Sequence, residues 1–375
     1  MKELRETYFS IQATLFPVLE DEKIEISGKI KEFVELIETV KPARFLNSLL
    51  FWTGLGRPMK NREAIIRALM LKHVYNLPTT KVLIETLKSS LSLCRLCGWD
   101  STHQVPSEAT FSRTFKILAE TQLLSVMHEA VVRENYTDKL VGHASTDSTE
   151  IIGREKVCRI VEKKPKIKKK RGRKSRAERE AMTAEEIAAE IAEVSTSRLE
   201  LQPKRSLEEN LADLPQGCDW GCKRNSKGKT ERWCGYKLHI TAGDGDVPLS
   251  AVLTSASLHD SQVAVPMMQM TSQRVTYFYD LMDAAYDAAK VKEASKQMGH
   301  IPIIDPNPRR GTTLPLEPAK ERRYDERTSV ERVNSNLKDN YGGRNVRVKG
   351  HWKVLCHLMF GILAITVKQL FNMLV

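Results

Sequence analysis

Residues 324–338 restrict the fold of this chain more than any other segment. The segment contains neither proline nor glycine, so a helix is allowed along its whole length. At about 100° per residue, one side of that helix is apolar and carries Val330, Val333 and Leu337. A second side, about 60° wide, carries the polar residues Tyr324, Arg327, Glu331 and Lys338. A solvated surface helix also has such residues, but a helix packed through its apolar side would present one carboxylate among two cations and a phenol.

Two aspartates follow segments that are predicted to be strands. Residues 140–146 form a short strand candidate that leads into Asp147, and residues 276–282 form another that ends at Asp283. With Glu331, these residues place three carboxylates at two strand ends and on one helix. Two Mg²⁺ ions about 4 Å apart need such carboxylates, with positions left open for water and phosphate oxygens. Asp280 is the alternative second ligand, although its side chain belongs to the strand interior.

The spacing Tyr324-x2-Arg327-x3-Glu331-x6-Lys338 matches, position for position, the Tyr-Arg-Glu-Lys signature of one group of insertion-sequence transposases. The chain therefore resembles the DDE (Asp-Asp-Glu) transposases of bacterial insertion sequences. This resemblance implies an α/β fold, in which an RNase H-like mixed sheet is flanked by helices, with an all-α N-terminal region and a basic insert. It implies two Mg²⁺ ions as cofactor, for which Mn²⁺ can substitute, and it assigns catalysis and metal binding to Asp147, Asp283 and Glu331.

The same resemblance assigns residues that bind the transposon end. It implies that Tyr324, Arg327 and Lys338 hold the end, since Arg gives a bidentate phosphate grip and Lys a point charge. Arg344 follows the helix and either extends this basic track or is a solvated loop charge. The chain departs from the family pattern Asp-x-Gly-Tyr, because Ala285 stands where the family has glycine. Alanine is tolerated there if its φ is negative.

Residues 1–138 are predicted to form a helical N-terminal DNA-binding region. One of its helices is expected to start at Ser107, a capping residue, and the polar, basic side of that helix includes Arg113. Such a helix can enter a DNA groove, although an amphipathic helix with a solvated face shows the same pattern. The RNase H-like catalytic domain is assigned to residues 139–151 and 231–375.

Residues 152–230 are predicted to be a basic, partly disordered insert. Within it, residues 163–176 contain ten Lys or Arg in fourteen residues and no acid. Such a run repels itself and is expected to be disordered when free. Arg171 and Arg173 flank a glycine, so they suit an A·T-rich minor groove, but they equally suit phosphates of any sequence.

The charge of the chain indicates nucleic acid as its partner. The formal net charge is +12 and the pI about 9.3, which favours an anionic partner. The resemblance makes that partner double-stranded DNA, as inverted-repeat ends and as target, with a homodimer in the DNA complex. No membrane partner is expected, since no apolar run approaches a membrane span and the first residues lack a signal-peptide core. We therefore expect a cytoplasmic, nucleoid-associated protein.

The cysteines allow a competing interpretation. A zinc site could be formed by Cys218, Cys222, Cys234 and His239, or include Cys94 and Cys97. These spacings fit no common zinc ribbon, and strand alternation assigns Cys234 and His239 to opposite faces. The odd number of seven cysteines fits reduced thiols better than a disulfide framework.

The function predicted from these features is that of a DNA transposase, with metal-dependent cleavage at transposon ends and strand transfer into target DNA. Two alternatives stay open. A non-catalytic DNA-binding protein derived from a transposase would have no use for an intact acid triad. A structure-specific RNase H-like nuclease would have no need of the Tyr-Arg-Glu-Lys set.

Overall fold

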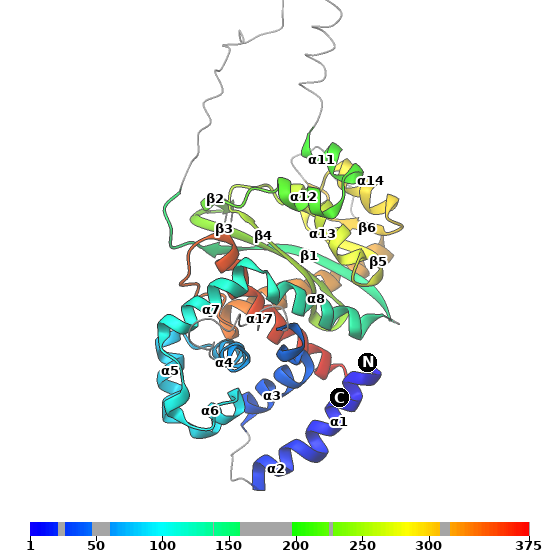
Figure 1. The fold of residues 1–375 in the computed structure, drawn as a ribbon. Helices are drawn as coiled ribbons and strands as arrows, with labels where there is room; N and C mark the ends of the chain where they lie inside the picture. The colour runs from blue at the N-terminus through cyan, green and yellow to red at the C-terminus, as the bar shows by residue number, and fades with distance from the viewer. Residues whose placement is uncertain are drawn as a thin grey trace, which may run out of the picture.

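The computed structural model describes residues 1–21, 27–46, 61–137, 139–157, 197–224, 228–307 and 316–374. Within these ranges, six strands form one sheet, in the order β2-β3-β1-β5-β6, with β4 paired to β3 (Figure 1). The strands are β1 (Leu140–Ile152), β2 (Asp219–Arg224), β3 (Thr230–Gly243), β4 (Val247–Ser255), β5 (Thr276–Met282) and β6 (Ile301–Ile304). β1 pairs antiparallel with β3 and parallel with β5, so the sheet is mixed, as predicted.

A tight turn joins β3 to β4 and also fixes the start of β1. The turn Asp244–Asp246 contains Gly245, whose φ of 74° suits glycine. The Asp244 carboxylate accepts hydrogen bonds from the backbone N–H of Gly142 at 2.6 Å and of His143 at 3.2 Å. The hairpin is therefore tied to the central strand, which sets the register of the strand that carries Asp147.

Helices cover both faces of the sheet. On one side, α13 (Ser261–Ser272) packs on β4, and α11 (Arg198–Leu201), α12 (Leu207–Asp213) and α14 (Ala289–Gln297) pack against α13. On the other side, α8 (Leu123–Tyr136) and α17 (His351–Asn372) contact β4, and α16 (Thr328–Asn340) contacts β1 and β3. The predicted α/β class, a mixed sheet flanked by helices, is confirmed.

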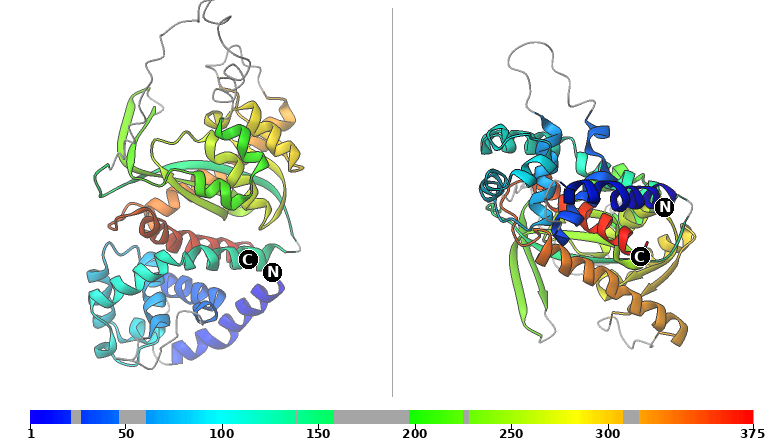
Figure 2. Two further views of the ribbon diagram at one scale, coloured as in Figure 1. Left: turned by 45° about the horizontal axis from the view of Figure 1, so that its top comes forward. Right: turned by 90° about the horizontal axis from the view of Figure 1, so that it is seen from below.

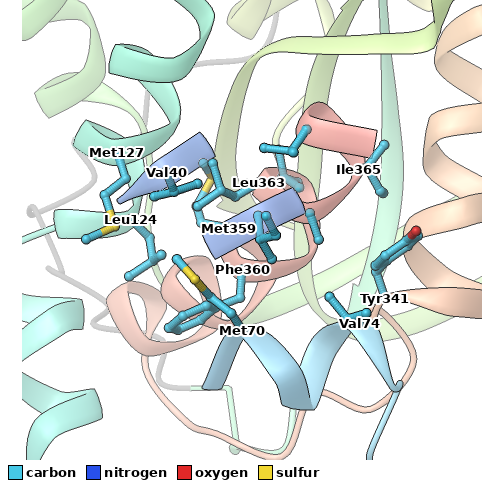
Figure 3. Packing of buried hydrophobic residues seen from close by; sticks show 14 of the residues in the cluster. Val40, Met70, Val74, Leu124, Met127, Tyr341, Met359, Phe360, Leu363 and Ile365 are labelled. Atoms are coloured by element: carbon cyan, nitrogen blue, oxygen red, sulfur yellow. The ribbon is translucent and has the colours of Figure 1, made fainter. Parts of the chain in front are cut away.

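The N-terminal helices surround α17 rather than forming a separate core. Figure 3 shows Met70 beside Phe360 of α17 and Val74 beside Tyr341, and Figure 2 shows α17 between these helices and the sheet. One continuous cluster of buried apolar residues includes both regions. The helices are α1 (Lys2–Ser10), α2 (Phe16–Asp21), α3 (Gly28–Val40), α4 (Arg62–Val74), α5 (Thr80–Ser89), α6 (Leu91–Cys97) and α7 (Glu108–Glu120).

The helix α17 corrects one expectation. The helix has 22 residues and an 18-residue window with a mean hydropathy of 1.8, so by length and composition alone it could cross a membrane, whereas no apolar run was expected to approach a membrane span. However, 89% of its apolar window is buried inside the fold. A helix that is apolar on all sides is expected at the centre of a large core, and α17 occupies that position here.

The predicted insert is shorter than expected. Residues 158–196, which include the basic run with Arg171 and Arg173, lie outside the described residues. Residues 197–224 instead contribute α11, α12 and β2 to the folded unit. The Arg198 guanidinium pairs with Asp213 at 2.7 Å, and Leu214 packs in an apolar cluster with residues of α13. Apolar packing on α13 is the physical reason why this part of the predicted insert is ordered.

Candidate active site

Asp147 and Asp283 lie at neighbouring positions on two parallel strands. In the register of β1 and β5, Thr146 pairs with Met282. Asp147 is the next residue of β1, and Asp283 directly follows the end of β5, so both residues are brought to the same region of the sheet. The structure therefore places together two acids that are far apart in the sequence.

The environment of these two aspartates disfavours their negative charge. Burial, and then the charge of Asp283, raise the pKa of Asp147 from 3.8 to about 7. Burial also raises the pKa of Asp283. The side chain of Asn334, on α16, donates a hydrogen bond of 3.4 Å to Asp147. Adjacent acids with raised pKa values are the donor set that a divalent cation would stabilise, so their chemistry fits a metal site.

The loop after β5 accommodates the alanine that replaces the family glycine. Ala285 does not have a positive φ, so its position does not require glycine. The Asp283 carboxylate accepts a hydrogen bond of 2.9 Å from the Ala285 backbone N–H. Tyr286 is fully buried, and its hydroxyl lies 3.4 Å from Nδ1 of His239. The loop thus holds Asp283 at the strand end through local contacts.

Asp280, the alternative second ligand, belongs to a different cluster. It is 1% exposed and accepts hydrogen bonds from the hydroxyls of Tyr277, at 2.9 Å, and Ser295. Nδ1 of His300 lies 3.3 Å from its carboxylate. These partners hold Asp280 in the interior, which favours Asp283 as the acid of the site.

Sequence reasoning missed a third acid near the pair. The charge of Asp260, at the start of α13, contributes to the raised pKa of both Asp147 and Asp283. Its own charge is partly offset by Lys237, whose Nζ lies 2.8 Å from the Asp260 carboxylate. The sequence gives Asp260 two features, a possible helix cap and a His-Asp pair after a hairpin that resembles the transposase core, but it does not assign Asp260 to the acid site. The available signal was an acid in the short connection between β4, which ends at Ser255, and α13, which begins at Ser261.

The segment that carries Glu331 is helical but not one uniform helix. α15 (Pro318–Tyr324) passes through a 3₁₀ turn (Asp325–Arg327) into α16. The Thr328 hydroxyl donates a hydrogen bond of 2.9 Å to the Asp325 carbonyl oxygen. The Ser145 hydroxyl of β1 donates one of 3.2 Å to the Glu326 carbonyl oxygen. Such side-chain bonds to carbonyls fit a locally tightened turn. The predicted apolar side is buried as expected, through Val330, Val333 and Leu337.

The Glu331 carboxylate forms an ion pair with Arg327. Nη2 of Arg327 lies 2.6 Å from Oε1 of Glu331, and the Glu331 side chain is 49% exposed. The guanidinium also lies 5.5 Å from the ring centroid of Tyr324. Among the described residues, no group of three His, Cys, Asp or Glu is arranged to hold a metal ion. In this structure the Glu331 carboxylate thus pairs with Arg327 and does not form a three-acid group with the aspartates among the described residues.

Arg327 nevertheless links Glu331 to the pair of aspartates, Asp147 and Asp283. Its positive charge acts on both Asp147 and Asp283, where it partly counters the rise in pKa. The carboxylate of Glu331 and the two aspartates therefore share one cation. Opening the ion pair between Arg327 and Glu331 would free the third carboxylate without unfolding the helix.

Lys338, predicted to bind the transposon end, forms an ion pair with Glu150 at 2.7 Å, and its side chain is 14% exposed. Lys223 of β2 contacts the same carboxylate at 2.7 Å. Burial tends to raise the pKa of Glu150. The hydrogen bonds from Lys223 and Lys338 outweigh this effect and lower the pKa of Glu150 to about 2. Neither Glu150 nor this contact was predicted from the sequence.

Two further predicted DNA-binding residues, Arg344 and Arg113, lie on the surface. Arg344 pairs with Asp339 at 2.8 Å and is well exposed. Arg113, on α7, is exposed, and its Nε donates to the Ala109 carbonyl at 3.2 Å. Their role in binding DNA stays a prediction.

The alternative zinc set is not assembled in the structure. Sγ of Cys234 lies 3.7 Å from Sγ of Cys218, whereas His239 is buried and contacts the hydroxyls of Tyr286 and Thr254. Cys222 is exposed on β2. The two halves of the proposed site thus have separate surroundings.

Asp147 yields a prediction about stability. Between pH 4 and 7 the folded state binds the Asp147 proton more tightly than the unfolded state, so stability falls as pH rises through this window. Asp147→Asn removes this cost, and we expect it to stabilise the metal-free protein by up to about 4 kcal/mol at pH 8. Near pH 4 the difference should disappear. Denaturant unfolding in the presence of a chelator measures the stability difference at each pH. Asp325→Asn, which changes an exposed acid, is the control. Equal stability of wild type and Asp147→Asn at pH 8 would contradict the raised pKa of Asp147.

The sheet and its acids define a class of protein. A mixed α/β sheet with aspartates on two neighbouring parallel strands and an acid on a later helix is the arrangement of nucleic-acid enzymes with an RNase H-like core. Comparison with known families is more specific. Residues 206–367 match a family described as the transposase DDE domain, and residues 21–116 match a transposase domain family (DUF772).

The chain is therefore recognised as an insertion-sequence transposase of the DDE class. The DDE match includes Asp283 and Glu331 and begins within the segment that was predicted to be an insert. The other match extends from the N-terminal helices to α7, which carries Arg113. No curated protein and no solved structure gives a significant match to the chain.

Proposed function

We propose that this transposase cuts DNA at the ends of its insertion sequence and joins the resulting 3′-hydroxyls to target DNA. Asp147, Asp283 and Glu331 would hold two Mg²⁺ ions. The observation that carries the proposal is the adjacency of Asp147 and Asp283 at the ends of paired parallel strand segments, where both carboxyl groups have raised pKa values. Bound there, the ions supply an activated water or 3′-hydroxyl and stabilise the leaving oxygen.

The residues of the chain supply positioning around this chemistry. Asn334 holds Asp147 by a hydrogen bond and fixes α16 against β1. Lys237 balances the charge of Asp260, which limits the negative charge beside the pair. Arg327 lies between the acids and can grip a phosphate with two parallel N–H donors. A DNA phosphate at this position would thus be held directly beside the aspartates.

Binding of DNA and completion of the acid triad are coupled in this proposal. The Arg327 guanidinium now pairs with Glu331 at 2.6 Å. A DNA phosphate is an alternative anion for the same guanidinium, so its arrival releases the Glu331 carboxylate toward the aspartates. The site would then be complete only when DNA is in place, which favours cleavage of bound DNA.

The partners follow from charge and family. With a net charge of +12, the chain suits double-stranded DNA, both as inverted-repeat ends and as target. We propose a homodimer in the DNA complex, acting in the cytoplasm at the nucleoid. The departure from the family pattern at Ala285 would favour a non-catalytic DNA-binding protein if it distorted the loop, but Ala285 does not have a positive φ, so no glycine is needed there.

The test uses DNA from both flanks of the gene, where the proposal requires matching inverted repeats. A labelled flank fragment, a target plasmid and Mg²⁺ are incubated with the protein, and the product junctions are sequenced. We expect cleavage at the repeat and 3′ ends joined to the plasmid, both abolished by chelation of the metal. Cleavage without joining would favour the nuclease alternative, and binding without cleavage the non-catalytic one.

A further inference from the structure

A cavity of about 310 Å³ lies away from the acid site, between the N-terminal helices and the segment that follows α16. Residues of α4, α5 and α7 form one part of its wall, and residues 345–348 form another. Its wall therefore comes from two regions that are more than 200 residues apart in the sequence. The charges on that wall indicate what it binds.

Lys72, on α4, lines this cavity and is only 7% exposed. Within the described ranges, its ammonium group has no ion pair and no hydrogen-bond acceptor. Burial, and then the charge of Arg347, lower the pKa of Lys72 to about 8, so it is still mostly protonated at pH 7. Burying an unpaired ammonium group is costly, and buried lysines normally have a partner. The missing partner is an anion that enters the cavity.

Arg347 adds a second cation to the same wall. It is exposed, lines the cavity, and forms no ion pair with any acid in the part of the chain that the structure describes. Glu108 also lines the cavity, but no ion pair joins it to Lys72 or Arg347. The buried histidines of the wall, His73 and His357, add no charge, because burial lowers their pKa values.

The start of α5 strengthens the positive field. Thr79 and Thr80 line the cavity, and the Thr79 hydroxyl oxygen already caps the backbone N–H of Val82 at 3.1 Å. The remaining first-turn N–H groups of this ten-residue helix attract anions, as helix N-termini do. Hydroxyl groups of Thr80 and Ser112 add neutral donors. Two cations, a helix N-terminus and hydroxyls are the groups that proteins use to bind phosphate.

The geometry points to this cavity as a binding site for a backbone phosphate of DNA, gripped by Lys72 and Arg347. The inference rests on the proposed function, because it assumes that the chain binds DNA. Lys72 belongs to the N-terminal helices, whereas Arg347 follows the helix that carries Glu331. One phosphate would thus connect the N-terminal region to the catalytic helix, so that DNA held by the first is positioned for the second.

The experiment compares full-length wild type with Lys72→Met, Arg347→Gln and the control Lys88→Gln. Lys88 is exposed on the last turn of α5, at the opposite end from the cavity, and its variant loses the same charge. Binding to a flank DNA fragment is measured in chelator over a range of salt. We expect the two cavity variants to bind about tenfold more weakly, with a salt slope smaller by about one, as for a lost phosphate contact. Lys88→Gln should match wild type.

Thermal melting separates lost binding from lost folding. Lys72→Met should melt at or above the wild-type temperature, because an unpaired buried charge is removed, and Arg347→Gln alters an exposed side chain. Wild-type affinity and salt slope in both cavity variants would overturn the inference, whereas a wild type that binds no DNA would overturn the proposed function itself. If inorganic phosphate at constant ionic strength stabilises wild type but not Arg347→Gln, while DNA binding is unchanged, the site is for free phosphate and the DNA assignment is wrong.

Discussion

A Glu331→Gln protein is expected to cleave transposon-end DNA about a thousandfold more slowly than wild type while binding it at least as tightly. Glutamine keeps the size and helix propensity of glutamate but cannot supply a negative oxygen to the metal site. Metal ions contribute several kcal/mol of transition-state stabilisation, which corresponds to a loss of this size. Binding should not fall, because removing the carboxylate frees Arg327 from its 2.6 Å ion pair.

A gel-shift assay and a cleavage assay on one labelled end fragment measure both effects. The matched control is Glu326→Gln, which removes one carboxylate from an exposed residue of the adjoining 3₁₀ turn. The control should cleave at the wild-type rate. Cleavage by Glu331→Gln at the wild-type rate would remove Glu331 from the catalytic site and would favour a different third acid, of which Asp260 is the nearest candidate.

Arg327→Ala is expected to have the opposite pattern of effects. End binding should weaken by about 10- to 150-fold, because a charged, bidentate phosphate contact of about 1.5–3 kcal/mol is lost. In the absence of DNA, however, the variant should bind Mg²⁺ more tightly than wild type, because Glu331 no longer has its cation. Titration of Mg²⁺ by calorimetry, without DNA and then with it, measures this exchange.

Arg332→Ala is the control for that experiment. Arg332 is on the same helix, but its guanidinium pairs with Asp246 of the hairpin turn at 2.6 Å, away from the aspartates. Its removal should leave both end affinity and Mg²⁺ affinity within about twofold of wild type. An Arg327→Ala protein with unchanged Mg²⁺ affinity would show that the ion pair does not hold Glu331 out of the site.

The sequence predicts most reliably where local pattern decides structure. The apolar spacing of Val330, Val333 and Leu337 sufficed to identify the buried side of α16, because helix periodicity depends only on the chain itself. The strands that carry Asp147 and Asp283 were likewise recognisable from their composition. Their pairing as parallel neighbours was not, because it depends on contacts between segments that are far apart in the chain.

Side-chain partners were the least predictable feature. The spacing of Tyr324, Arg327 and Glu331 put them on one side of a helix, but the choice of Glu331 for Arg327 rather than for the aspartates depends on rotamers and charge in three dimensions. Lys338 contacts Glu150, an acid of β1 that has no distinguishing sequence signal, and its predicted contact with the transposon end stays a prediction. Lys72 and Arg347 are separated by most of the chain, so their shared cavity could not be inferred from either.

The folded part of the predicted insert, residues 197–224, was not recognised for a different reason. The run of cations at 163–176 dominates the composition of its surroundings, and the neighbouring residues were grouped with it. Ser206 and Glu209, however, form a capping box at the start of α12, where each side chain bonds the other's backbone N–H. That signal lay in the sequence, and it marks a helix within the segment that was predicted to be an insert.

The most direct test of this account is the anomalous diffraction of Mn²⁺ in crystals of the protein bound to its end DNA. The account predicts two manganese peaks about 4 Å apart. Both should contact the carboxylates of Asp147 and Asp283, with Glu331 turned from Arg327 to one of the ions and the guanidinium on a DNA phosphate. Peaks bound elsewhere, or a Glu331 that still pairs with Arg327 beside a filled site, would contradict it.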